Sequence, residues 1–321
     1  AQMALQQDDV ETARSALEEA RQNLPQVSDQ AGDDAEQQLD QVDQSIQQAL
    51  DALKRHSIEV VVLDIEMPVM DGLTALPKLL EADPELKIVM ASTLTLAGAE
   101  ISMRALTLGA ADYLPKPSNV SALAGPGEFR QGLIEKIKAL GQARRRRKVI
   151  RGGQSTAVSK GVAAKTMSGQ APVVIRKPGI KPAEALIIGS STGGPQALLK
   201  LFSDLKTSVR LPILITQHMP PTFTSILAQH LSKASGMLAA EGKDGEVIEG
   251  GRIYVAPGNF HMIVERKDAA RIIRLTQTPP ENFCRPAVDP MLRSLAKAYD
   301  GRLLVVILTG MGQDGMLGAR E

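Results

Sequence analysis

The sequence contains no tryptophan, only five phenylalanines and three tyrosines, and a single cysteine, Cys284, among 321 residues. One cysteine cannot form an intramolecular disulfide, so a disulfide-stapled secreted fold is excluded and a reducing compartment is expected. With so few aromatic rings, the cores must be built from Leu, Ile, Val, Ala and Met. No apolar run approaches the ~20 residues that span a bilayer. We therefore predict a cytoplasmic protein without membrane insertion.

Charge is balanced overall but distributed unevenly. The 37 basic and 36 acidic residues give a net charge of +1, which argues against a dedicated nucleic-acid binder. Residues 1–53 nevertheless contain twelve acidic and two basic side chains, and their apolar residues recur at spacings of three, four and seven. Such spacing is typical of amphipathic helices. We predict an acidic helical segment over residues 1–44, which is either a simple extension or a coiled coil that binds a partner.

Two regions alternate strand-like and helix-like stretches, which is the pattern of a parallel α/β sheet. Residues 45–141 predict a flavodoxin-type domain, and residues 184–321 predict a second, doubly wound domain. Between them, residues 142–183 lack apolar periodicity and are rich in Gly, Ser, Ala and Lys, which predicts a flexible basic linker. Its four consecutive arginines, 144–147, are either solvated or a site for nucleic acid or acidic lipid. The chain stops where a helix is starting, so we expect a truncated second domain.

The first domain places a carboxylate, a hydroxyl and an ammonium at the ends of three predicted strands. Asp64 follows the first apolar run, Ser92 the second and Lys116 the third. Parallel strands end at the same edge of a sheet, where these groups suit a phosphoryl group. The carboxylate accepts it, the hydroxyl bonds one of its oxygens and the lysine neutralises its charge. The alternative is an ordinary capping aspartate and a surface lysine.

The segments LDIEMPVMDG and DYLPKP, with a Ser–Thr pair between them, resemble the receiver domain of two-component signalling. The resemblance implies that Asp64 accepts a phosphoryl group from a histidine kinase. It also implies that the backbone carbonyl of Glu66 helps Asp64 to bind Mg²⁺. The residues that match the family's switch pair and its lysine are Ser92, Tyr113 and Lys116.

One part of the receiver pattern is displaced. Receivers begin with an apolar strand that ends in an acidic pair and completes the metal site. Here the only comparable pair, Asp8–Asp9, follows the polar run AQMALQQ. We therefore expect an incomplete receiver that starts near residue 44, with Asp9 as the candidate for the missing ligand and with weak Mg²⁺ binding.

Three loops of the second domain each follow an apolar, strand-like run. They are GSSTGG with Ser190 and Ser191, QHMPP with His218, and GMGQDG with Asp314. At one edge of a parallel sheet these side chains supply a nucleophile, a base and an orienting acid. The pattern predicts a serine hydrolase whose chemistry requires no cofactor.

Each of these residues also has a simpler interpretation. The SSTGGP turn is equally typical of a small-residue turn or of a phosphate cradle, although the GxxxxGK[ST] pattern is absent. His218 on its own is more typical of a structural histidine, and Asp314 of a turn aspartate. Asp289 is the rival acid, and His261 is a second histidine that fits the same cleft.

Five ordered segments, IGSSTGGPQAL, QHMPP, APGNFHM, RPAVD and LTGMGQDG, resemble the chemotaxis protein-glutamate methylesterase (CheB) family. Members of that family demethylate glutamyl methyl esters and often deamidate glutamines. The order of receiver, linker and catalytic domain also matches the family. The nucleophile implied by the resemblance is the serine directly before the threonine. The implied residues are Ser191, His218 and Asp314, with an oxyanion hole at Thr192 and Met311.

The resemblance further implies methyl-accepting chemoreceptors as protein substrates, and a receiver that covers the active-site cleft until it is phosphorylated. Two other classes stay open on the residues alone. One is a response regulator whose output is binding, with the arginine run contacting DNA or membrane, although no helix-turn-helix pattern supports it. The other is a catalytically inactive scaffold. Ester hydrolysis by residues 184–321 would separate the enzyme from both.

Overall fold

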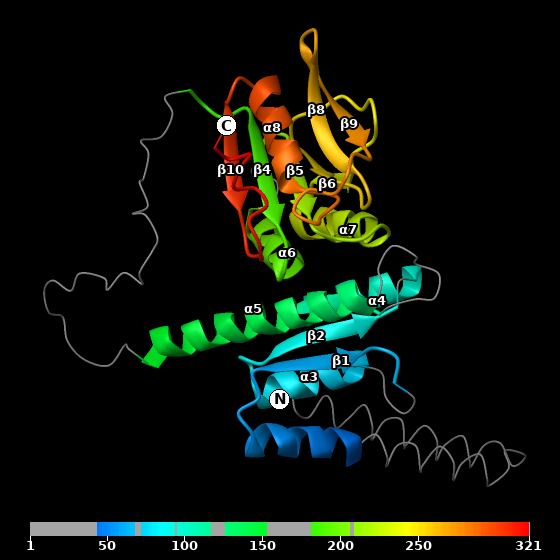
Figure 1. Ribbon diagram of the computed structural model, residues 1–321, viewed down its shortest axis with the longest axis vertical. Coiled ribbons are helices and arrows are strands. Elements are labelled where there is room, and N and C mark those ends of the chain that lie inside the picture. The colour runs from blue at the N-terminus through cyan, green and yellow to red at the C-terminus, as the bar shows by residue number, and fades with distance from the viewer. Residues whose placement is uncertain are drawn as a thin grey trace, which may run out of the picture.

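A computed structural model describes residues 44–67, 72–93, 95–116, 126–152, 181–205 and 209–320. They form two α/β domains joined through a segment outside those ranges (Figure 1). The predicted acidic helical segment lies outside the described residues except for its last one, where a helix of residues 44–55 begins. None of the helices in the described ranges is long and apolar enough to cross a membrane.

The first domain contains a three-stranded parallel sheet in the order β1-β2-β3. Helices α3 and α4 pack on one face, and α5 covers the other (Figure 1). The central strand β2 is buried, and its interior residues 88–91 are apolar, as is usual for parallel sheets. The elements are β1 (Val60–Asp64), α3 (Gly72–Ala82), β2 (Lys87–Ser92), α4 (Leu96–Thr107), β3 (Asp112–Pro115) and α5 (Pro126–Gly152).

The last of these helices corrects the sequence analysis. The flexible linker is expected to begin at residue 142, whereas α5 continues to Gly152. Arg144 donates to the carbonyl of Ile58 at 2.9 Å and pairs with Asp83 at 2.5 Å. Arg145 pairs with Glu59. The start of the arginine run therefore extends the helix, because arginine is a good helix former and these two side chains bind the receiver.

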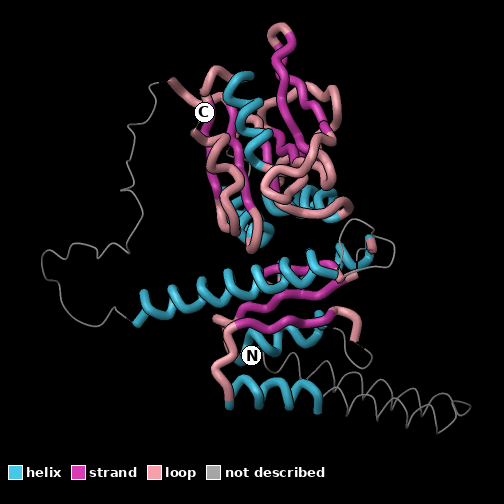
Figure 2. Tube along the Cα trace, in the orientation of Figure 1, coloured by secondary structure: helices cyan, strands magenta, loops and turns pink. Residues whose placement is uncertain are grey.

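The second domain contains a five-stranded parallel sheet in the order β10-β4-β5-β7-β6. Helices α6 and α7 pack on one face, and α8 with the β8–β9 hairpin packs on the other (Figures 1 and 2). The strands are β4 (Ala185–Ser190), β5 (Ile213–Gln217), β6 (Leu238–Glu241), β7 (Arg252–Val255), β8 (His261–Lys267), β9 (Ala270–Thr276) and β10 (Leu303–Ile307). The helices are α6 (Gly194–Leu205), α7 (Phe223–Ser235) and α8 (Val288–Ala298).

Both domains match the predicted fold class, two parallel-sheet α/β units. Strand β4 is buried along its whole length, and its side chains alternate between the two cores. This burial fixes the strand's register and therefore the place where its serines emerge.

The two domains share one hydrophobic core. Helix α4 of the receiver packs against α6 and α7 of the second domain, and β3 contacts α6. The rings of Tyr113 and Phe223 stack across this contact. The backbone N–H of Gly193 donates to Asp112 at 3.3 Å, and Asp112 also pairs with Lys136 of α5 at 2.6 Å. The receiver therefore touches the loops that follow β4 and β5.

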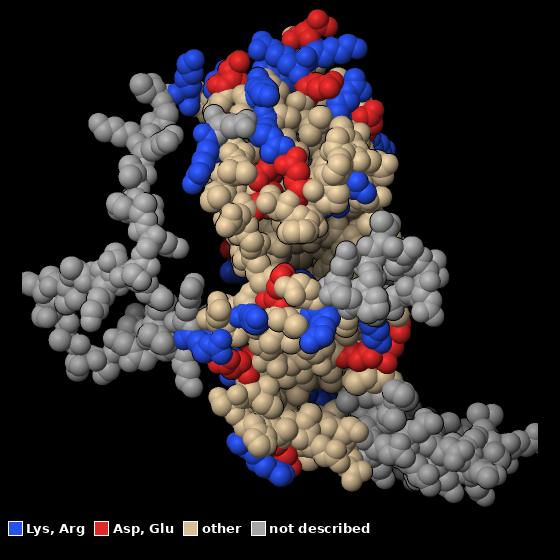
Figure 3. Space-filling view, viewed as in Figure 1, with Lys and Arg blue, Asp and Glu red and all other residues tan. Residues whose placement is uncertain are grey.

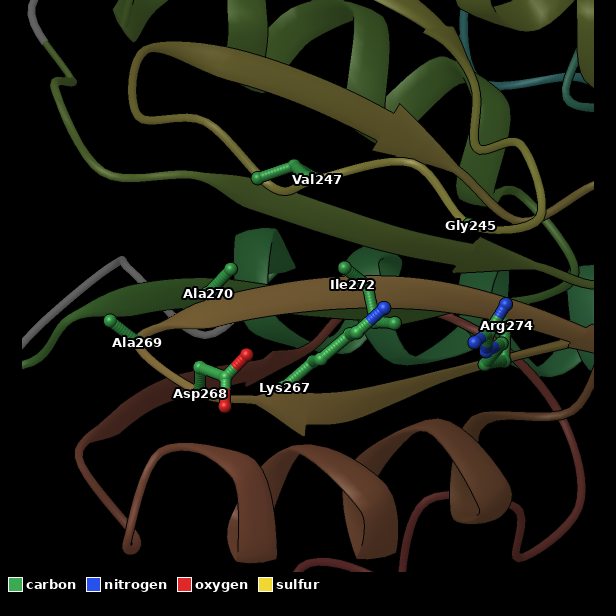
Figure 4. A pocket seen from close by; sticks show the side chains of 8 residues that line it. All are labelled: Gly245, Val247, Lys267, Asp268, Ala269, Ala270, Ile272 and Arg274. Atoms are coloured by element: carbon green, nitrogen blue, oxygen red, sulfur yellow. The ribbon is translucent and has the colours of Figure 1, made fainter.

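Charged side chains gather at the other end of the second domain. Figure 3 shows many lysines and arginines over the end that carries the β8–β9 hairpin, away from the receiver. A pocket on this hairpin is lined by residues that include Lys267, Asp268 and Arg274 (Figure 4). Its lining contains no member of the predicted serine site.

Candidate active site

The predicted serine, histidine and aspartate follow three adjacent strands. Ser191 comes directly after β4, His218 directly after β5, and Asp314 lies in the loop after β10. Because β10, β4 and β5 are neighbours in a parallel sheet, their carboxyl ends deliver these loops to one edge. The strand order therefore explains how residues far apart in the sequence come together.

His218 lies between the other two side chains. Its Nδ1 is 3.1 Å from Ser191 Oγ, and its Nε2 is 2.7 Å from Asp314 Oδ2. The carboxylate only accepts, so in the neutral ring Nε2 carries the proton and Nδ1 has a lone pair facing the serine. The two ring nitrogens thus have the opposite assignment from the chymotrypsin-type triad. The predicted geometric order, with the histidine in the middle, is confirmed.

Only one of the two adjacent serines faces the histidine. Ser190 is buried and its hydroxyl donates to Gln217 Oε1 at 2.7 Å. Ser191 is held by its N–H, which donates to the carbonyl of Thr309 at 3.0 Å. Gly310 packs so closely that an added Cβ would lie 2.8 Å from Ser191 Cβ. The glycine is therefore required for the last loop to pass beside the serine.

Asp314 is anchored at the N-terminus of α8. Its carboxylate accepts the N–H of Val288 at 2.6 Å and the N–H of Asp289 at 3.0 Å. No side chain at the N-cap position, Ala287, performs this role. Burial raises the pKa of Asp314, but hydrogen bonds from His218 and from these two N–H groups outweigh it and lower the pKa. The acid is thus held ionised beside the histidine.

His218 has a raised pKa. Burial of the ring opposes the cation, but hydrogen bonds and charge interactions with Asp314 and Cys284 outweigh it and raise the pKa to about 9. Cys284 Sγ lies 3.4 Å from Nδ1, on the same ring nitrogen that faces the serine. The sequence analysis used this cysteine only to exclude disulfides. No pattern around it marks a neighbour of the histidine.

Asn282 is a second residue that sequence reasoning missed. Its Nδ2 donates to Asp314 Oδ1 and to Asp289 Oδ2, each at 3.1 Å. The rival acid, Asp289, is buried and accepts the N–H of Gly318 at 2.6 Å, so it supports the site from behind. His261 is also buried, and its ring bonds the backbone of Ala287 and of Pro279. Among the described residues, neither Asp289 nor His261 forms a hydrogen bond with Ser191.

The predicted oxyanion residues lie on both sides of the serine. Thr192 is buried and follows Ser191 in the turn that leads into α6. Its carbonyl accepts the hydroxyl of Thr309 at 3.1 Å, which ties the β4 loop to the β10 loop. Met311 follows Gly310, the residue packed on Ser191. Both positions therefore adjoin the serine, while their oxyanion role stays a prediction.

The structure brings together part of the predicted receiver site. Asp64 Oδ1 lies 2.7 Å from Lys116 Nζ and accepts the N–H of Glu66 at 3.0 Å. Ser92 ends the adjacent strand, but its hydroxyl is buried and donates to the carbonyl of Gly98 at 2.9 Å. Ser92 directly follows Ala91, the register partner of Asp64, but its hydroxyl is engaged with the start of α4, and its role toward a phosphoryl group stays a prediction.

Two further receiver residues have distinct surroundings. The hydroxyl of Thr93, next to Ser92, donates to Glu66 Oε1 at 3.1 Å and therefore faces the acidic side chains. Tyr113 is buried against Phe223, and burial raises the pKa of its phenol well above the usual value. Tyr113 thus lies at the contact with the second domain and not beside Asp64.

The described residues supply only part of a metal site. Mg²⁺ requires near-octahedral oxygen ligands, of which the Asp64 carboxylate and the Glu66 carbonyl are two candidates. Asp9, the third candidate, lies outside the described ranges. Within those ranges, no group of three His, Cys, Asp or Glu side chains is arranged to hold a metal. These donors alone do not fit Mg²⁺, so no chemical step below passes through it.

Comparison with known proteins identifies the two halves. Residues 186–321 match the family described as CheB methylesterase, and residues 8–125 match the response regulator receiver domain. The receiver match begins earlier than the start near residue 44 that we predicted, and it includes Asp8–Asp9. The acidic pair therefore falls within the receiver homology.

Curated relatives cover most of the chain. Protein-glutamate methylesterase/protein-glutamine glutaminase 1 of Paramagnetospirillum magneticum is 56% identical over 85% of this chain and 74% of that protein. The corresponding enzyme of Azospirillum brasilense is 54% identical, with 86% and 72% covered. The solved CheB methylesterase catalytic domain of Thermotoga maritima is 39% identical over 44% of this chain and 74% of that chain, with a TM-score of 0.42. The chain therefore belongs to the CheB-type family of protein-glutamate methylesterases/protein-glutamine glutaminases, which join a receiver domain to a methylesterase domain.

Proposed function

We propose that this chain hydrolyses glutamyl methyl esters on chemoreceptors, with Ser191 as nucleophile, His218 as base and Asp314 as orienting acid. The observation that carries the proposal is the position of His218, 3.1 Å from Ser191 Oγ and 2.7 Å from Asp314 Oδ2. Membership of the methylesterase family supports the substrate class. The exposed side of the ring remains accessible, since 15% of the His218 side chain is open to solvent.

The first half of the reaction forms an acyl-enzyme. His218 Nδ1 removes the Ser191 proton as Oγ attacks the ester carbonyl. The resulting imidazolium is stabilised by Asp314, whose depressed pKa keeps it anionic. The tetrahedral oxyanion is stabilised by donors near Thr192 and Met311, at the two loops that adjoin the serine. Collapse of this intermediate expels methanol, which takes the proton from His218.

The second half releases the glutamate. His218 Nδ1 activates a water molecule, which attacks the acyl carbonyl, and Ser191 Oγ leaves with the proton from the ring. A glutamine side chain follows the same steps, except that ammonia leaves in place of methanol. Deamidation therefore uses the same three side chains and no additional group.

The receiver half regulates this site in the proposal. Asp64 accepts a phosphoryl group from a histidine kinase, and Lys116, 2.7 Å away, neutralises part of the added charge. Two contacts connect the receiver to the catalytic loops, namely the stacking of Tyr113 on Phe223 and the bond from Gly193 to Asp112. Incubation with acetyl phosphate, with and without added Mg²⁺, tests this step, because Asp64→Asn should abolish both labelling and any change in esterase rate.

The two adjacent serines provide the test of the catalytic site. Ser191→Ala should lower kcat for methanol release from a glutamyl methyl ester peptide on the order of 10⁶-fold, as expected for loss of a triad nucleophile. Ser190→Ala should keep most of the activity but lower stability, since it leaves Gln217 Oε1 without its hydroxyl donor. Equal loss of activity from both substitutions would show that Ser191 is not the nucleophile.

A further inference from the structure

A strained turn lies beside the triad. Residues 281–284 form a two-residue turn in which Glu281 N–H donates to the Cys284 carbonyl at 3.1 Å and Cys284 N–H donates back at 2.9 Å. Its central residues, Asn282 and Phe283, have φ values of 51° and 62°. Two consecutive positive φ values define a type I′ turn, which usually has Asn and Gly at these places. Phenylalanine in the second place is strained, because only glycine adopts such a backbone freely.

Every residue of this turn except Phe283 is anchored. Asn282 bonds Asp314, and Cys284 lies 3.4 Å from His218 Nδ1. Glu281 pairs with Arg293 of α8 at 2.6 Å. The turn is therefore fixed to the base, to the acid and to the helix behind them.

Phe283 itself contacts almost nothing. Its relative exposure is 103%, which is the highest of the exposed large hydrophobic residues in the described ranges. A ring of this size gains free energy only when apolar surface covers it. The backbone at Phe283 is strained although its ring is exposed, and the residues on either side of it contact Asp314 and His218. Strain retained at such a place indicates a functional role. The contacts of these two neighbours with the triad put the turn that carries the ring beside the site where a substrate reacts.

We propose that Phe283 is a specificity residue that packs against an apolar side chain of the protein substrate next to the esterified glutamate. This inference rests on the proposed esterase function. The occupant is a segment of the protein substrate that carries an apolar side chain beside the ester; in a helical segment, that side chain would lie three or four positions away. Aromatic residues commonly dominate such contacts because one ring supplies a large rigid surface.

The test compares two esters on the full chain. One is a helical peptide with a glutamyl methyl ester and leucines three and four residues away. The other is N-acetylglutamate γ-methyl ester, which carries no neighbouring apolar side chain to contact the ring. Phe283→Ala should lower kcat/KM for the peptide about tenfold, equivalent to about 1.4 kcal/mol, and leave the small ester unchanged. Replacing the peptide's leucines with serine should remove most of that difference.

Matched variants separate recognition from folding. Phe283→Gly removes the ring but relieves the positive φ, so its thermal midpoint should equal or exceed that of the unsubstituted chain while peptide hydrolysis still falls. Phe283→Tyr should keep near-normal activity. Leu238→Ala, at another exposed apolar side chain on β6, should change neither ester.

The outcomes distinguish the recognition role of Phe283 from the esterase function on which it rests. Equal loss on both esters would overturn the recognition role, because the turn would then act through the triad. Unchanged peptide hydrolysis in Phe283→Ala would overturn it as well. Failure of the unsubstituted chain to hydrolyse either ester would instead overturn the proposed function.

Discussion

The ring of Tyr113 stacks on the ring of Phe223 with centroids 4.5 Å apart and planes inclined by 9°. Tyr113 belongs to β3 of the receiver, and Phe223 begins α7, five residues after His218. A residue that the receiver pattern marks as a switch position therefore packs directly on the helix that follows the catalytic histidine.

This stacking predicts a measurable coupling energy. Tyr113→Leu and Phe223→Leu should each lower the free energy of unfolding, and the double variant should lower it by less than the sum of the two. The expected coupling is about 0.5–1.5 kcal/mol, the usual value for an aromatic pair beyond its area burial. Denaturant titration of the four proteins measures it. Strict additivity would show that the two rings do not interact in solution.

The raised pKa of His218 predicts the pH profile. Only the neutral ring accepts the Ser191 proton, so kcat/KM should rise with pH and level off above about 9. The folded-state pKa lies above the unfolded value of 6.5, so the histidine's contribution to stability is complete below pH 6.5. It is lost as pH rises through 9. A kinetic midpoint at the ordinary histidine value would contradict this account.

Cys284 should contribute to the pH at which kcat/KM is half-maximal. Its hydrogen bond and charge interaction both raise the pKa of His218, so Cys284→Ala should move the midpoint of kcat/KM to lower pH. Measuring the profile of the variant alongside that of the unsubstituted chain checks the direction. Cys284→Ser, which retains a polar group near Nδ1, is the matched control and should shift the midpoint less. An upward shift in Cys284→Ala would show that the thiol does not stabilise the cation.

Asp314 should affect both catalysis and stability. Asp314→Asn should lower kcat about 10⁴-fold, because an amide no longer selects the tautomer with Nε2 protonated. It should also destabilise the fold, since the N–H groups of Val288 and Asp289 lose a charged acceptor. Asp289→Asn is the control at the rival acid and should retain catalysis. Comparable kcat losses in both variants would reopen the choice between them.

Acid titration gives a second check on Asp314. Its folded-state pKa is depressed, so its contribution to stability is present above the unfolded value of about 3.9. That contribution is lost as pH falls through the lower folded value. The stability difference between the unsubstituted chain and Asp314→Asn should therefore shrink in acid.

The triad could be predicted from sequence because its positions follow from strand order. Ser191 and His218 directly follow buried apolar strands, and Asp314 lies in the loop after the third, so parallel pairing alone brings them to one edge. Asn282 and Cys284 could not be predicted, since they lie in an irregular turn whose place depends on contacts with α8 and the triad itself. Neither has a spacing signal.

In the receiver, too, some positions could be predicted from sequence and others could not. Asp64 ends β1 and Lys116 directly follows β3, on either side of β2, and their side chains meet 2.7 Å apart at the shared carboxyl edge of the sheet. The partner of the Ser92 hydroxyl could not be predicted, because a hydroxyl rotates toward whichever acceptor the following helix offers. The length of α5 was missed because Arg144 and Arg145 look like linker charges until their partners, Asp83 and Glu59, are known.

The core that spans both domains sets a threshold for any signal that separates them. Opening the contact exposes the apolar surface around Tyr113 and Phe223 to water, so the closed arrangement has the lower free energy. A stimulus that supplies less than this free-energy difference leaves most molecules closed. It raises the ratio of open to closed molecules about tenfold for each 1.4 kcal/mol. Substitutions at this contact should therefore change how strong a signal is needed to separate the domains, while leaving the catalytic residues unaltered.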